Sequence, residues 1–200
     1  MLAASALVAS KGVWYLMRSS GVVSLVLLTG VMVLGIATAN RWRPGRAPRF
    51  VTAGLHRSIA LLAVCFVAVH VVTAVVDPYA MVSAVAVVVP FVGAHKPLEI
   101  GLGALSVDLV VALVVTSLLR RRLGLRVWRG VHWLAYLAWP VALFHSLGIG
   151  SDTGTLWMRA VTAGCVAAVG GALVVRLWNT NHGKRLEPQR VPRSALKVPA

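Results

Sequence analysis

Acidic side chains are scarce in this chain, which has 5 aspartates and glutamates against 20 lysines and arginines. Charged residues of both signs make up only 12% of the sequence, whereas hydrophobic residues make up 58%. Soluble domains usually carry about 25% charged residues. Together with a mean hydropathy of +0.83, this composition excludes an ordinary soluble domain and indicates an integral membrane protein.

Cysteine is also rare, and its placement excludes the usual thiol sites. Cys65 and Cys165 both lie in apolar segments, without CxxC or zinc-type spacing, so we interpret them as packing residues. The net charge of +15 would suit a nucleic-acid partner. However, the arginines lie between apolar segments, where membrane proteins keep them. We therefore expect the lipid bilayer, and no nucleic acid, as the partner.

Five apolar segments have about the 20 residues that a membrane span needs. They are residues 14–39, 51–76, 98–119, 127–147 and 156–178. Residues 79–97 are apolar too, but Pro90 interrupts them and His95-Lys96-Pro97 closes them. We expect an interfacial or re-entrant excursion there. The predicted organisation is an extracytoplasmic tail (1–12), a transmembrane domain (13–178) and a basic, disordered cytoplasmic tail (179–200).

The distribution of arginines predicts the orientation of these spans. With five spans, the arginine-rich stretches 41–49 and 120–129 and the basic tail all fall on one side. Positively charged loops stay in the cytoplasm. We therefore predict a multi-pass protein of the cell membrane, with its amino terminus outside and its carboxyl terminus inside. A sixth span at 79–93 would place the two arginine-rich stretches on opposite sides.

Four of the six histidines stand in pairs on two predicted spans. His56 and His70 are 14 residues apart, and His132 and His145 are 13 apart, which is roughly 20 Å along a helix. The two spans run parallel in the predicted topology. His56 is therefore expected level with His132 on the inner side, and His70 level with His145 on the outer side.

Three interpretations of these histidines can be compared, and one of them, a zinc site, is excluded by the spacing. They could be buried polar groups bonded across helices, although ionisable groups at this depth usually mark a function. Zinc needs about four convergent ligands, which histidines roughly 20 Å apart cannot supply. Neutral imidazole is also an axial ligand of haem iron. The helical phase is imperfect, because 13 steps miss a full turn by about 140°; we expect a kink at Pro140 or a π-bulge to correct it.

The sequence resembles the ferric-reductase transmembrane domain. That domain is shared by ferric-chelate reductases, NADPH oxidases and the haem subunit of bacterial methionine sulfoxide reductase. The resemblance rests on the two histidine spacings. It also rests on the run Thr116-Ser-Leu-Leu-Arg-Arg-Arg-Leu-Gly124, followed by Trp128-Arg-Gly-Val-His132 and Tyr136, and extends over about residues 13–178.

The resemblance implies an all-α integral membrane bundle that encloses two stacked b-type haems. His56 with His132 would ligate the iron of the inner haem, and His70 with His145 that of the outer one. Electrons would pass from the inner to the outer haem and on to an extracytoplasmic acceptor. Arg57 and Arg129 flank the inner histidines and would pair with haem propionates, unless they are ordinary positive-inside anchors.

The large eukaryotic members of the family carry a flavin and nicotinamide domain after the last span. Here only about twenty residues follow Trp178, without a GxGxxG-type loop. We therefore expect an oxidoreductase subunit that lacks its own flavin and NAD(P)H domain. Its donor would be a quinol, free reduced flavin, or a separate flavoprotein that brings its own flavin. The acceptor stays open among ferric chelate, oxygen, a quinone and a partner flavoprotein.

Two further questions stay open at the level of sequence. Asp108, in the middle of a span, could relay protons, serve a haem site or bond a neighbouring helix. His95, with Lys96, is expected on the outer surface near the outer haem site, where it could meet an acceptor, although we favour an ordinary solvated loop histidine. His182 in the tail is expected to be inert. A second class of function also remains, namely a non-redox membrane protein whose histidines are structural, bind a metal or relay protons.

Overall fold

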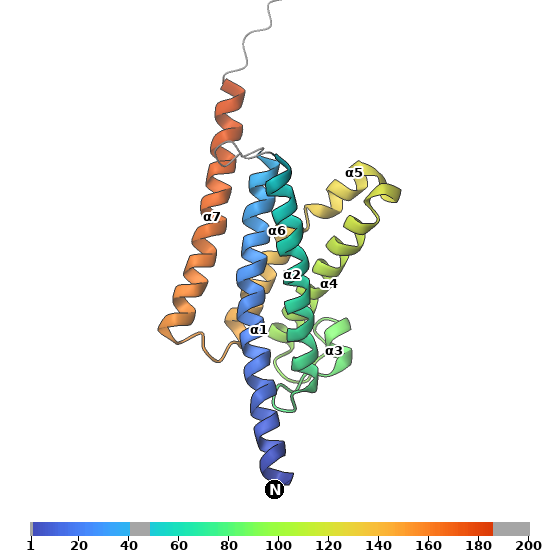
Figure 1. Cartoon of the computed structure of the whole chain (residues 1–200), viewed down its shortest axis with the longest axis vertical. Coiled ribbons are helices and arrows are strands. Elements are labelled where there is room, and N and C mark those ends of the chain that lie inside the picture. The colour runs from blue at the N-terminus through green and yellow to red at the C-terminus, as the bar shows by residue number, and fades with distance from the viewer. Residues whose placement is uncertain (1, 41–48, 186–200) are drawn as a thin grey trace, which may run out of the picture.

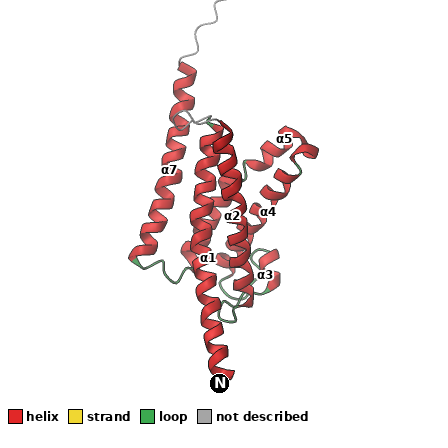
Figure 2. Ribbon diagram, in the orientation of Figure 1, coloured by secondary structure: helices red, strands yellow, loops and turns green. Residues whose placement is uncertain are grey.

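The computed structural model describes residues 2–40 and 49–185, and these residues form helices joined by short loops (Figures 1 and 2). Within the described residues there are no strands. The helices are α1 (Leu2–Ala39), α2 (Arg49–Val76), α3 (Ala84–Val88), α4 (Pro97–Leu118), α5 (Arg120–His132), α6 (Ala135–Ile149) and α7 (Leu156–Arg185).

Four of these helices are long and apolar enough to cross a bilayer, which makes the chain a multi-pass membrane protein. The candidate spans are Lys11–Ala39, Phe50–Val76, Pro97–Leu118 and Leu156–Thr180. Consecutive long helices run in opposite directions, with α1 against α2 and α4 against α6, while α7 packs on α1 at the side of the bundle (Figure 1). As predicted, α2 and the helix that carries His145 run parallel (Figure 1).

The fourth predicted span, 127–147, is not one continuous helix. Its first part belongs to α5, an arginine-rich helix with no buried residues, which turns away from the bundle (Figure 1). Its second part is α6, which has 15 residues and is therefore only about 22 Å long. Gly124 inside α5 has φ 76°, a conformation that glycine adopts without steric cost. The positive φ bends the chain between α4 and the rest of α5.

The break between α5 and α6 also rotates the chain. Leu134 donates its N–H to the carbonyl of Val131 at 2.9 Å, and Leu137 donates to Leu134 at 2.9 Å. Such three-residue turns advance about 120° per residue instead of 100°. The five steps from His132 to Leu137 lie between the two histidines, and over them this adds roughly 100°. The overwinding therefore supplies most of the rotation that brings His132 and His145 to the same face.

The expected source of this rotation needs correction. The described part of α6 contains no π-bulge, so that prediction is wrong. A π-bulge would also rotate the chain in the opposite direction. Pro140 lies inside α6, which continues as a helix on both sides of it. The overwound turns come before Pro140, around Trp133 and Leu134.

The excursion between α2 and α4 contains only the five-residue helix α3 and no spanning helix. Asp77 follows the end of α2, and its Oδ1 accepts the N–H of Tyr79 at 2.9 Å. The ring of Phe91, a residue with φ 68°, lies where a side chain on Gly101 would be, since a Cβ there would be 2.2 Å from its Cδ1. The excursion is thereby fixed against α4.

The core of the bundle consists of two apolar clusters that share one side chain. One contains Leu25 and Leu143, the other contains Ile36 and Val169, and Trp139 packs against both. The indole N–H of Trp139 donates to Thr29 Oγ1 at 2.9 Å. Trp139, which lies between His132 and His145 in the sequence, thus fixes α6 against α1.

Helical structure extends into both predicted tails. Helix α1 already begins at Leu2, and α7 continues to Arg185, so residues 179–185 are helical and not disordered. Extending an existing helix fixes one residue for each hydrogen bond gained, which favours such continuation. Residues 186–200 lie outside the described part of the chain.

Candidate functional site between two pairs of histidines

The structure brings the four histidines together in the two predicted pairs. The ring centres of His56 and His132 are 6.4 Å apart, and those of His70 and His145 are 6.3 Å apart. The ring planes cross at 72° and 74°, respectively. The two sites therefore share one geometry, although the histidine spacings differ along α2 and along α5–α6.

This geometry suits two imidazoles on opposite sides of one metal ion. A metal–imidazole bond is about 2.0–2.1 Å, and a ring nitrogen lies roughly 1.1 Å from the ring centre, so the two centres would be about 6 Å apart. Within the described residues, no group of three or more His, Cys, Asp or Glu side chains could hold a metal ion. Two facing imidazoles are a donor set that would fit the iron of a haem.

The ring of His70 is held by the backbone of α1. Its Nδ1 lies 2.9 Å from the carbonyl oxygen of Met17. A Cβ on Gly21, four residues further on, would lie 2.9 Å from the His70 Cε1. A carbonyl oxygen in a helix has a second lone pair, and the glycine at the next turn leaves space for the ring to reach it. When Nδ1–H donates to this oxygen, Nε2 keeps its lone pair for a metal.

The same arrangement recurs at two other histidines. In each case Nδ1 bonds the carbonyl of a residue that stands four positions before a glycine, and the ring lies against that glycine. The distances from Nδ1 to the carbonyl oxygen are 3.0 Å and 2.7 Å. The sets are His56 with Val31 and Gly35, and His145 with Glu99 and Gly103.

His132 is held differently from the other three. Its Nδ1 is buried and has no hydrogen-bond partner in the described part of the chain. Its ring stacks on Trp128, with centres 4.9 Å apart and planes 27° from parallel. Trp128 is fixed in turn by a 3.3 Å hydrogen bond to Ser117 Oγ and by Arg120 over its ring. Aromatic stacking within α5 thus replaces the carbonyl bond.

A cavity of about 370 Å³ opens beside the outer pair. His70 and His145 line it, together with Gly21, Gly103 and Met158. This volume lies within the range of ligand pockets. The polar residues of its lining include Trp14, Arg18, Ser24, Tyr79, His95, Lys96, Ser106 and Asp152. His95 and Lys96, expected on a solvated loop, therefore contribute to the lining of this outer cavity.

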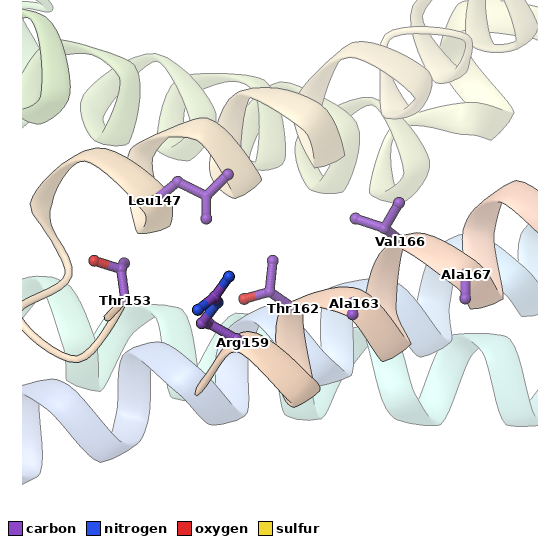
Figure 3. A pocket seen from close by; sticks show the side chains of 7 residues that line it. All are labelled: Leu147, Thr153, Arg159, Thr162, Ala163, Val166 and Ala167. Atoms are coloured by element: carbon purple, nitrogen blue, oxygen red, sulfur yellow. The ribbon is translucent and has the colours of Figure 1, made fainter. Parts of the chain in front are cut away.

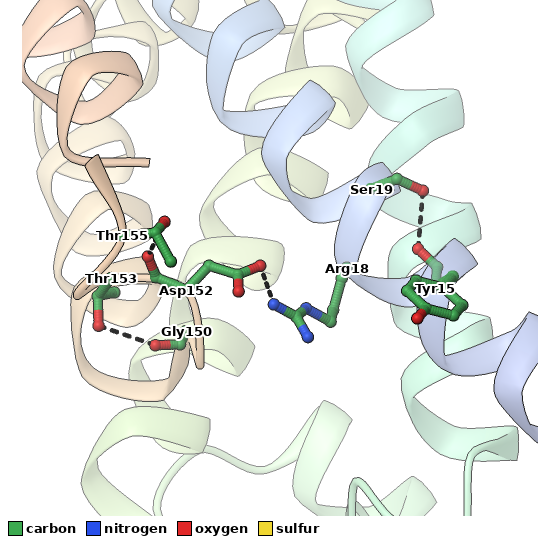
Figure 4. A network of polar contacts seen from close by, with 7 residues as sticks. All are labelled: Tyr15, Arg18, Ser19, Gly150, Asp152, Thr153 and Thr155. Atoms are coloured by element: carbon green, nitrogen blue, oxygen red, sulfur yellow. Dashed lines mark hydrogen bonds and ion pairs between the residues drawn. The ribbon is translucent and has the colours of Figure 1, made fainter. Parts of the chain in front are cut away.

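Next to this cavity, an ion pair joins helix α1 to the loop between α6 and α7. Arg18 on α1 forms an ion pair with Asp152 in the loop before α7 (Figure 4). The guanidinium also lies 4.0 Å from the ring centre of Trp14. Thr153 donates its hydroxyl to the carbonyl of Gly150 at 2.9 Å, which holds the loop in shape (Figure 4). The loop that follows His145 is thereby attached to the helix that supports His70.

A second cavity, of about 530 Å³, lies between the end of α6 and the first turns of α7 (Figure 3). Leu147, Val166 and Ala167 give it apolar walls, and Arg159 points into it (Figure 3). Thr153 lines both cavities. None of the paired histidines contributes to this second cavity, so it is separate from the histidine sites.

The arginines expected near the inner pair lie on the surface. Arg57 and Arg129 are both exposed, and within the described residues neither side chain makes a hydrogen bond or an ion pair. A different arginine is fixed at this end of the bundle. Arg176 on α7 donates to the hydroxyl of Tyr136 and lies 5.3 Å from the ring centre of Trp133. It ties α7 to the overwound turn after His132.

The sequence analysis did not single out the glycines under the rings as part of the site. A signal for them was present. Gly21 and Gly35 are 14 residues apart, as are His56 and His70. In an antiparallel helix pair, equal spacings place the first glycine against the second histidine, and the second glycine against the first.

Comparison with known proteins gives one match. A family model described as a ferric reductase like transmembrane component matches residues 20–143. The match includes His56, His70 and His132 and ends two residues before His145. No curated protein and no solved structure matches the chain. Since the family match covers more than half of the sequence, the chain belongs to the ferric reductase-like transmembrane components, a family of membrane oxidoreductase-type proteins.

Proposed function

We propose that this chain is the membrane subunit of a ferric reductase-like oxidoreductase and carries electrons across the cell membrane to an extracytoplasmic acceptor. In this proposal, His56 and His132 hold one b-type haem, and His70 and His145 hold a second. Bound haem would supply reversible one-electron chemistry. The observation that carries the proposal is the pair of ring-centre distances, 6.4 and 6.3 Å.

The side chains and carbonyls around the histidines support this assignment. The carbonyls of Val31, Met17 and Glu99 accept Nδ1–H bonds from His56, His70 and His145. These bonds fix the tautomer that leaves Nε2 available and set the direction of each ring. At the inner site, Arg57 and Arg129 are proposed partners for the propionates. Their exposure leaves both free to reorient toward carboxylates.

The proposed direction of electron flow is inferred from the distribution of basic residues between the two ends of the bundle. His56 and His70 are 14 residues apart on α2, so the two sites lie roughly 20 Å apart along the membrane normal. The arginine-rich helix α5 leads into His132, and positive segments face the cytoplasm. We propose that electrons enter at the His56–His132 end and leave at the His70–His145 end.

Donor and acceptor are separate molecules in this proposal. The donor is a flavoprotein, a quinol or free reduced flavin on the cytoplasmic side, where basic segments attract anionic molecules. The acceptor is a ferric chelate, oxygen, a quinone or a partner flavoprotein on the opposite side. The outer cavity, which His70, His145, His95 and Lys96 line, is the proposed place of exit.

Haem content tests the proposal. The purified protein should contain two low-spin haems per chain, measured as the pyridine haemochrome. Because each iron would have both axial positions filled, carbon monoxide should change the spectrum little. His132→Leu and His145→Leu should each leave one haem. A folded protein without haem would contradict the proposal and favour the non-redox alternative.

Transport through the chain requires a second measurement. In proteoliposomes loaded with a reductant, the wild type should reduce external ferric chelate. His145→Leu should retain a haem that the internal reductant reduces, but should lose external reduction. A His145→Leu protein that reduces the external chelate at the normal rate would rule out the proposed relay even with haem present.

A further inference from the structure

Helix α5 carries five arginines among its 13 residues, and none of its residues is buried. In the part of the helix that follows Gly124, Arg126 lies about 160° around the axis from Trp128 and about 120° from His132. Arg126 therefore stands on a different face of α5 from the histidine of the inner site. Arg121 and Arg122, in the first turn, are exposed as well.

These arginines have no acidic partner within the described residues. The one ion pair there joins Arg18 to Asp152, at the other end of the bundle. The sequence has only 5 acidic residues, and Glu187 lies outside the described part. The remaining four are Asp108 in the middle of α4, and Asp77, Glu99 and Asp152 at the end of the bundle away from α5. The anions that neutralise α5 therefore belong mostly to other molecules.

The place and composition of α5 favour a membrane surface as the source of these anions. The helix begins two residues after the end of the spanning helix α4, and it lies at the same end of the bundle as the start of α2 (Figure 1). Val127, Trp128 and Val131 fall within about 100° on one side of the axis. A helix with apolar residues on one side and arginines on the other lies between acyl chains and headgroups, and such basic clusters beside a membrane span attract anionic phospholipids.

Helix α5 also determines the position of His132. The guanidinium of Arg120 lies 5.1 Å from the ring centre of Trp128, and Trp128 stacks on His132 at 4.9 Å. Nδ1 of His132 has no hydrogen bond within the described residues, whereas the other three paired histidines are bonded to a carbonyl of another helix. Whatever holds α5 in place therefore also holds the His132 ring.

We propose that Arg121, Arg122 and Arg126 bind the phosphate groups of anionic phospholipids, and that this docking of α5 keeps His132 in position at the inner site. A guanidinium is suited to this ligand, because its planar fork donates two hydrogen bonds to phosphate oxygens. The lipid site stands on the charges of α5 alone. Its coupling to the inner site rests on the proposed function, because it concerns haem held by His56 and His132.

Lipid binding is measured first, on the full-length protein in phosphatidylcholine nanodiscs. Spin-labelled phosphatidylglycerol is titrated in, and the immobilised component of the resonance spectrum reports the bound lipid. Replacing Arg121, Arg122 and Arg126 with glutamine should weaken binding about fivefold for each arginine that holds a phosphate. Replacing the same three with lysine keeps the charge and should retain most of the binding.

The control for this measurement is the double variant Lys11→Gln and Arg159→Gln. It removes two exposed cations at the other end of the bundle and should bind the lipid as the wild type does. Equal binding by the wild type and the triple glutamine variant would overturn the lipid site. An acidic protein surface would then be the better partner for α5.

Loss of haem to apomyoglobin tests the coupling. With one quarter phosphatidylglycerol in the nanodisc, the wild type should lose the inner haem about fivefold more slowly than in pure phosphatidylcholine. The triple glutamine variant should lose it at the same rate in both. The outer haem is the internal control, because carbonyls of α1 and α4 hold both of its histidines.

Two outcomes separate this proposal from the proposed function. Loss of the inner haem at a rate independent of the lipid would overturn the coupling, although both haems were present. A folded protein that contains no haem but prefers phosphatidylglycerol through these arginines would contradict the proposed function and the coupling. It would still support the lipid site.

Discussion

The ring of His145 occupies the space that a side chain on Gly103 would fill. A Cβ built on Gly103 would lie 2.6 Å from the His145 Cε1 and 2.7 Å from its Nδ1. This is closer than van der Waals contact allows. The glycine is therefore a requirement of the site, in addition to its effect on how closely α4 and α6 approach.

Gly103→Ala is accordingly expected to displace the His145 ring and break its hydrogen bond to the Glu99 carbonyl. Haem per chain should fall from two toward one, as measured by the pyridine haemochrome. The control is Gly164→Ala on α7, where no atom lies within 4 Å of the added Cβ. Alanine is the better helix former, so this control should keep both haems. Full haem content in Gly103→Ala would show that the ring does not need its present position.

Trp128 is expected to determine how firmly the inner site holds its ligand. Aromatic stacking contributes about 1 kcal/mol, and His132 Nδ1 has no hydrogen bond to replace it within the described residues. Trp128→Leu should therefore weaken retention of the inner haem roughly fivefold in competition with apomyoglobin. Trp157→Leu serves as the control, since Trp157 is half exposed and distant in sequence from both pairs. Equal effects of the two variants would refute a positioning role for Trp128.

The crossing angles of the rings predict a spectroscopic signature. Imidazole planes at 72° and 74° leave two d orbitals of a low-spin ferric iron close in energy. Electron paramagnetic resonance of the oxidised protein should therefore show highly anisotropic signals at high g. Nearly parallel rings would give a rhombic spectrum instead. A purely rhombic spectrum would mean that both pairs rotate when the cofactor binds.

Topology can be tested with two reporters. Phosphatase fused after Gly154 should be active outside the cell, and a fluorescent protein fused after Lys197 should be active inside, because α7 crosses between them. The arginine-rich segments predict this orientation. Phosphatase activity at Lys197 together with none at Gly154 would show that the bundle is inverted.

Much of the bundle follows from local sequence signals. Long apolar segments predict the candidate membrane spans within α1, α2, α4 and α7 to within a few residues, since uninterrupted hydrophobicity over a span leaves few alternatives. The pairing of His56 with His132 and of His70 with His145 follows from topology alone. The boundary between α5 and α6 does not follow, because the overwound turn at Trp133 and Leu134 has no proline or glycine to mark it.

The surroundings of the rings were predictable only in part. The matched spacing of Gly21 and Gly35 was present in the sequence, but its meaning depends on which helix packs against which. The support of His145 by Glu99 and Gly103 depends on the α4–α6 packing, which no spacing indicates. The exposure of the Asp108 side chain is a property of the assembled bundle, because the sequence of an almost wholly apolar helix does not indicate which face packs against its neighbours.

The shortness of α6 has an electrical consequence. A bilayer core is about 30 Å thick, whereas 15 residues of α6 extend only about 22 Å. In the proposed topology, the arginine-rich α5, with no buried residues, would meet the polar headgroups at a depth that the longer helices reach only inside the hydrocarbon. The insulating layer beside His132 would then be thinner than the rest of the membrane, and a larger share of the membrane potential would fall between the two histidine pairs. Moving one electron from the inner to the outer pair would then be directly sensitive to that potential, at about 2.3 kcal/mol per 100 mV for a full crossing.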